Sequence, residues 1–83
     1  MGKENIKYKE VVIEAIRNED GVEYQKGNFT AEEIADIVNT YLKTFEEVAI
    51  VFNYPKGTTH TIYKELSVEE VVELGLDEPT LPN

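Results

Sequence analysis

The segment from Asn53 to Tyr63, NYPKGTTHTIY, contains the only histidine of the chain, together with lysine, threonine and tyrosine side chains that often bind ligands. Pro55-Lys-Gly57 lies between two runs rich in β-branched residues, a pattern typical of a three-residue hairpin loop with Gly57 in a left-handed conformation. These residues could form a catalytic or binding site, or they could be no more than the bend of a hairpin.

The pairing of the two runs decides which side chains share a face of the hairpin. A three-residue loop places Ile50 opposite Ile62 and Phe52 opposite His60 on the more apolar face. That face should pack against the helices. We therefore expect His60 to lie beside Phe52 at the edge of the core, as a packing or hydrogen-bonding residue and not as a catalytic one.

The other face of the hairpin carries a row of polar and aromatic side chains, which we call the hairpin stripe. Hydroxyl and amide groups can bind a sugar, a phosphate or a base edge, and a tyrosine ring offers a stacking surface. The same residue types are also good strand formers on a solvated face. The stripe is a candidate site for a small, nucleotide-like ligand, and its residues are Asn53, Lys56, Thr59, Thr61 and Tyr63.

Other catalytic or metal-binding patterns are not found in the sequence. One histidine and no cysteine exclude disulfides and the common zinc clusters. The acidic segments lack the spacing of a calcium-binding loop. Paired carboxylates such as Glu32-Glu33 and Glu69-Glu70 lie at helix starts, where the helix dipole explains them. We therefore expect no catalytic residue, no metal site and no cofactor, and we interpret the chain as non-enzymatic.

The charge of the chain points to a class of partner. Eight Lys and Arg residues against 17 Asp and Glu give a net charge of −9, which disfavours direct binding to nucleic acid or to an anionic membrane. A basic protein surface is favoured, for instance that of a nucleic-acid-binding protein whose ligand the carboxylates imitate, as small acidic proteins of bacterial viruses do. The carboxylates expected to face the partner are Glu32, Glu33, Asp36, Glu69, Glu70, Glu73, Asp77 and Glu78.

The function predicted from these observations is that of a small acidic inhibitor or adaptor protein, with small-ligand binding by the hairpin stripe as the alternative. Acidity that only keeps the domain soluble is a third interpretation. No apolar run approaches the roughly 20 residues that cross a bilayer, and no signal peptide is recognisable. Together with the lack of cysteine, this favours a cytoplasmic protein.

Hydrophobic periodicity and capping residues predict three helices. Apolar residues in 6–17 recur at i, i+3, i+4, i+7 and i+8, which indicates a helix over 5–18. A strand fits this segment less well, because the run Val11-Val12-Ile13 would place apolar side chains on both faces of the strand. Capping boxes that begin at Thr30 and Ser67 predict helices over 31–43 and 68–74.

The predicted fold is a single α+β domain over 1–75 followed by a C-terminal tail, 76–83. Two longer helices and the short C-terminal helix pack on an antiparallel hairpin of 46–54 and 58–66, with a possible third edge strand at 22–25. A chain of 83 residues buries a thin core, so a homodimer is plausible. The predicted core is Val11, Val12, Ile16, Ile34, Ile37, Val38, Leu42, Ile50, Phe52, Ile62 and Val72.

Overall fold

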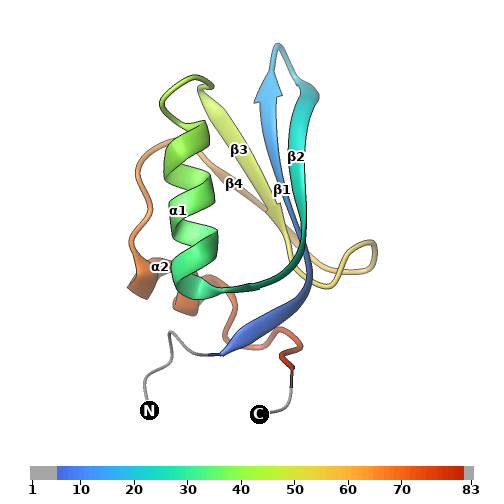
Figure 1. Ribbon diagram of the computed structural model, residues 1–83. Coiled ribbons are helices and arrows are strands. Elements are labelled where there is room, and N and C mark those ends of the chain that lie inside the picture. The colour runs from blue at the N-terminus through green and yellow to red at the C-terminus, as the bar shows by residue number, and fades with distance from the viewer. Residues whose placement is uncertain (1–5, 82–83) are drawn as a thin grey trace.

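A four-stranded antiparallel sheet with two helices on one side makes up the computed structural model, which describes residues 6–81 (Figure 1). The sheet has the strand order β2-β1-β3-β4. The predicted α+β class is confirmed, but there are two helices in the described residues and not three. The elements are β1 (Lys7–Arg17), β2 (Asp20–Thr30), α1 (Ala31–Tyr41), β3 (Glu47–Val51), β4 (Thr59–Ile62) and α2 (Val68–Leu74).

The helix predicted over 5–18 is wrong, because this segment forms β1, a central strand of the sheet. A β-bulge explains the misleading spacing. Tyr8 pairs with Phe29 and Val11 with Gly27, so two residues of β1 lie opposite one residue of β2. The bulge shifts the alternation of side chains. Tyr8 and Val11, three residues apart as on a helix face, are consequently both buried.

The central position of β1 explains why both of its faces carry apolar side chains. Val11 and Ile13 are fully buried in the core, while Val12 points to the opposite face and is only 9% exposed. The run Val11-Val12-Ile13 disfavours a strand only when one face of that strand meets water. A strand paired on both sides has two faces that neighbouring side chains can cover.

A tight turn after the predicted helix segment connects β1 to β2. Arg17 pairs with Asp20, which leaves a two-residue loop. Both loop residues, Asn18 and Glu19, have positive φ angles of 53° and 70°, as a type I′ turn requires. The predicted edge strand at 22–25 is present but is much longer, and β2 forms one edge of the sheet.

The two predicted capping boxes are confirmed. At the start of α1, the Thr30 hydroxyl accepts from the Glu33 N–H at 3.1 Å, and the Glu33 carboxylate accepts from the Thr30 N–H at 2.8 Å. Ser67 and Glu70 make the same reciprocal pair at the start of α2. The helices begin where the sequence predicts, because a capping box satisfies N–H groups that have no partner within the helix.

The β3–β4 hairpin forms, but its register and loop differ from the prediction. Ile50 pairs with His60 and not with Ile62, and residues 52–58 form a longer loop. The shift is two residues, so the paired side chains of β3 and β4 keep their predicted faces. Gly57 has no positive φ. A side chain there would clash with the carbonyl oxygen of Phe52, so close backbone approach requires this glycine.

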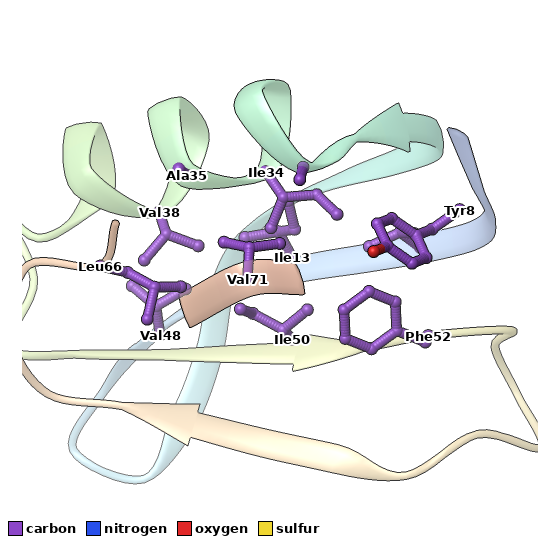
Figure 2. Packing of buried hydrophobic residues seen from close by; sticks show 12 residues of the cluster. Tyr8, Ile13, Ile34, Ala35, Val38, Val48, Ile50, Phe52, Leu66 and Val71 are labelled. Carbon is purple, nitrogen blue, oxygen red and sulfur yellow. The ribbon is translucent and has the colours of Figure 1, made fainter. Parts of the chain in front are cut away.

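The core lies between the helices and the sheet, and Figure 2 shows its packing. At one end the Tyr8 ring meets Phe52 edge-on, with ring centroids 5.2 Å apart. The predicted core residues Val12 and Ile16 are not part of this cluster. The buried members are Tyr8, Val11, Ile13, Ala31, Ile34, Ala35, Val38, Val48, Ile50, Phe52, Leu66 and Val71. The partly buried side chains around them include Ile37, Leu42, Ile62 and Val72, all predicted for the core.

Residues 79–81, within the predicted C-terminal tail, are hydrogen-bonded to the beginning of β1. The Leu81 N–H donates to the Lys7 carbonyl at 2.8 Å, and the Lys9 N–H donates to the Pro79 carbonyl at 3.1 Å. Residues 82–83 of the tail lie outside the described residues, as does residue 5 of the predicted N-terminal helix.

The side on which each isoleucine of β1 lies can be tested by truncation. We expect Ile13→Ala to lower the free energy of unfolding by about 2–5 kcal/mol, because Ile13 is fully buried. Ile16→Ala should cost about 1 kcal/mol, because this side chain is only half-buried. Urea unfolding followed by circular dichroism measures both. A larger cost at Ile16, which a helix over 5–18 would produce, would contradict the strand.

Candidate interaction surfaces

The two helices lie side by side on the same face of the sheet and contact each other (Figure 1). Neither helix contains a lysine or arginine, and six carboxylates occupy exposed positions on them. We call this surface the acidic helical layer. Its residues are Glu32, Glu33 and Asp36 on α1 and Glu69, Glu70 and Glu73 on α2.

Two of the six carboxylates cap the helices that carry them. The Glu70 carboxylate accepts from the Ser67 N–H at 2.9 Å, and its own N–H donates to the Ser67 hydroxyl at 3.2 Å. The hydrogen bond from the Ser67 backbone, followed by that from its side chain, lowers the pKa of Glu70. Glu70 is therefore ionised at neutral pH. The other four carboxylates have no capping role.

A paired amide contact fixes α2 against α1. Asn39 of α1 donates from Nδ2 to the Leu66 carbonyl and accepts at Oδ1 from the Leu66 N–H, each at 2.8 Å. Leu66 is buried and comes directly before the α2 cap, Ser67. The Asn39 side chain thus satisfies the backbone hydrogen-bonding groups of Leu66 as a neighbouring strand would. This contact fixes the position of the start of α2, and therefore of its carboxylates, relative to α1.

The last two carboxylates of the predicted partner surface, Asp77 and Glu78, follow α2 in a turn. The Glu78 N–H donates to the Gly75 carbonyl at 3.1 Å. Gly75 lies against the Tyr8 ring, with which an added Cβ would collide. These two residues therefore lie at the end of α2 and not on the acidic helical layer itself.

Thr59 and Thr61 of the hairpin stripe lie on the side of the sheet opposite to the helices, whereas Tyr63 follows β4 and borders a depression beside Asn39 of α1. Thr59 pairs with Val51 and Thr61 with Ala49, and both threonines are exposed. Lys56 is exposed in the loop, where its N–H donates to the carbonyl of Asn53 at 3.0 Å.

The stripe does not surround one common cavity. Tyr63 and Thr61 line a shallow depression of about 250 Å³ together with Leu66 and Glu70, whereas Asn53, Lys56 and Thr59 do not line it. Ligand binding by the stripe therefore stays a prediction.

His60 lies where the sequence places it, beside Phe52 at the edge of the core. The two rings meet edge-on with centroids 5.8 Å apart. Its Nε2 atom is buried and has no hydrogen-bond partner among the described residues. His60 is a packing residue in this structure.

The sequence analysis missed a third surface, which the helices leave uncovered and which lies on the same side of the sheet as Thr59 and Thr61. A depression of about 330 Å³ lies there. It was missed because it depends on β1 being a strand. The residues that line it come from β1, β2, β3 and the β3–β4 loop, and they are Val12, Glu14, Tyr24, Lys26, Val51 and Tyr54.

Within residues 6–81, no helix has the length and apolar character to span a membrane. The same residues contain no group of three or more side chains placed to hold a metal ion. Comparison with protein-family models, curated proteins and solved structures gives no match for this chain.

The Asn39 contact predicts a measurable stability effect. Asn39→Ala should lower the free energy of unfolding by about 1–3 kcal/mol, because it leaves the buried backbone groups of Leu66 without partners. Thr40→Ala, at an exposed neighbouring position, is the control and should change stability by less than about 0.5 kcal/mol. Equal effects of the two substitutions in urea unfolding would contradict the anchoring role.

The capping carboxylate predicts a pH dependence. The pKa of Glu70 is lowered from 4.5 in the folded chain. The ionised Glu70 carboxylate therefore stabilises the fold at pH values above its unfolded-state pKa, and this stabilisation is lost as the pH falls through its folded-state pKa. Glu70→Gln should therefore be less stable than the wild type at pH 7 and should match it in strong acid.

Glu69→Gln, which removes the same charge beside the cap, is the control for this pH series. Thermal unfolding between pH 2 and pH 7 measures all three proteins. A stability difference for Glu70→Gln that stays constant over this range would contradict the prediction.

Proposed function

We propose that this protein is a non-enzymatic inhibitor or adaptor that binds a basic protein surface through its acidic helical layer. One observation carries the proposal: two helices in contact present six exposed carboxylates with no lysine or arginine on either helix. A surface of one charge sign attracts a partner of the opposite sign and repels partners of its own sign.

The distribution of the basic residues supports this assignment. In the described residues every lysine and arginine lies outside the helices, on the sheet or in its connections, including Arg17 on β1 and Lys26 on β2. Lys64, in the connection between β4 and α2, lies close enough for its charge to help lower the pKa of Glu70, whereas the helices themselves carry no positive charge. Electrostatic steering by such a layer should raise the association rate and make binding sensitive to salt.

The spacing of the carboxylates supports a nucleic-acid-binding protein as the partner class. Glu32 and Asp36 lie one helical turn apart on α1, as do Glu69 and Glu73 on α2. Each helix therefore carries a row of negative charges roughly 5–6 Å apart. A surface that binds the regularly spaced phosphates of a nucleic acid could bind these rows instead.

The test is an affinity capture in which charge is removed from the helices but their caps are kept. The helical variant combines Glu32→Gln, Asp36→Asn, Glu69→Gln and Glu73→Gln. The control variant removes the same charge from other exposed positions and combines Glu19→Gln, Asp20→Asn, Glu23→Gln and Glu65→Gln.

Immobilised wild type should retain nucleic-acid-binding proteins from a lysate of the source cells at low salt and release them on addition of salt or duplex DNA. We expect the helical variant to retain at least about tenfold less of these proteins, and the control variant to retain nearly as much as wild type. The proposal would be contradicted if neither salt nor DNA released the retained proteins, or if both variants lost the same fraction of them.

A further inference from the structure

We propose that a second copy of this chain covers the uncovered side of the sheet, so that the protein forms a homodimer with its two sheets face to face. This side, which we call the open face, is defined by strand pairing, because opposed residues share a face. Val12 pairs with Lys26 and Val51, Glu14 with Tyr24 and Ala49, and Ile16 with Glu47. Both helices lie on the other side of the sheet (Figure 1).

The centre of the open face is apolar although no helix covers it. Val12 is only 9% exposed and Ala49 only 5% exposed, shielded by the side chains around them. Tyr24 and Tyr54 flank this centre and are 65% and 43% exposed. Exposed aromatic rings beside apolar side chains on the surface of a small domain are typical of an interaction site.

The shape of the open face suits a second copy. The depression of about 330 Å³ is floored by Val12 and Val51 and bordered by Tyr24, whose ring stands mostly free of its own chain. A protruding ring beside a hollow is self-complementary under a two-fold axis, because each copy offers its ring to the hollow of the other.

The charges of the open face are complementary to themselves. Lys26 and Glu14 both line the depression, so a two-fold axis that passes midway between them would place Lys26 of each copy near Glu14 of the other. The Lys26 ammonium already lies 5.3 Å from the centroid of the Tyr54 ring, at the border of the depression. The acidic helical layer cannot associate with itself in this way, since all of its charged side chains are negative.

The size of the open face predicts a dissociable dimer. The pairing of β1 with β3 covers five residues of each strand. With about 3.3 Å per residue and about 4.8 Å between strands, the face measures roughly 17 by 19 Å. Its plan area of roughly 320 Å² lies below the roughly 800 Å² that each partner buries in a standard interface. We therefore expect a weak dimer that dissociates on dilution. The dimer would present two acidic helical layers on opposite outer sides, which extends the proposed function without depending on it.

Sedimentation equilibrium between about 1 µM and 500 µM tests the dimer without any other partner. The mass of the wild type should rise from 9.5 kDa toward twice that value with concentration. Val51→Lys, which places a charge in the depression, should weaken association at least tenfold while far-UV circular dichroism stays unchanged. The control is Leu76→Ser, which removes an apolar side chain that is 68% exposed outside the sheet and should associate as wild type does.

A mixing experiment tests the two-fold pairing of the charges. Lys26→Glu and Glu14→Lys should each be monomeric, because each variant brings like charges together across the axis. An equimolar mixture should dimerise, since the two faces are then complementary. The proposal is overturned by a wild type that stays at 9.5 kDa over the whole range, by equal behaviour of Val51→Lys and Leu76→Ser, or by a mixture that stays monomeric.

Discussion

Strand β1 is hydrogen-bonded to a neighbouring strand along both of its edges, and most of the molecule is placed by contact with it. It pairs with β2 on one side and with β3 on the other, and its Tyr8 ring packs on Gly75 after α2. The bulge at Lys9 and Glu10 has two consequences. It keeps Tyr8 on the same face as Val11, and its carbonyls accept from the N–H groups of Asn53 and Tyr54 in the β3–β4 loop.

The strand separates two surfaces of different chemistry. On one side the helices pack against the sheet, and their exposed positions carry carboxylates and no basic residue. On the other side, apolar and aromatic side chains surround one lysine and one glutamate in the same depression. A surface with charge of a single sign selects a partner of opposite charge, while a mixed apolar surface can associate with its own copy. The two proposed roles therefore use opposite sides of a thin molecule, 16 Å across its shortest dimension.

Local signals in the sequence were sufficient for some elements and not for others. The capping boxes at Thr30 and Ser67 predict both helices because the hydrogen bonds of each box join residues of a single four-residue segment. The faces of the β3–β4 hairpin, and His60 beside Phe52, follow from alternation alone. Register and strand identity depend on distant partners, for example Asn28, whose side-chain oxygen accepts from the Glu10 N–H in the bulge at 2.9 Å. The acidic helical layer was therefore accessible from the sequence, whereas the open face, which requires β1 as a strand, was not.

Amide hydrogen exchange measured by NMR tests the central position of β1 most directly. With β1 paired on both sides, the amides of Val11 to Ala15 should exchange most slowly, with opening free energies close to that of global unfolding. Amides between Val22 and Lys26 of the edge strand β2 should exchange faster. Rapid exchange in Val11 to Ala15, or helical backbone chemical shifts over 6–17, would contradict the account of both surfaces.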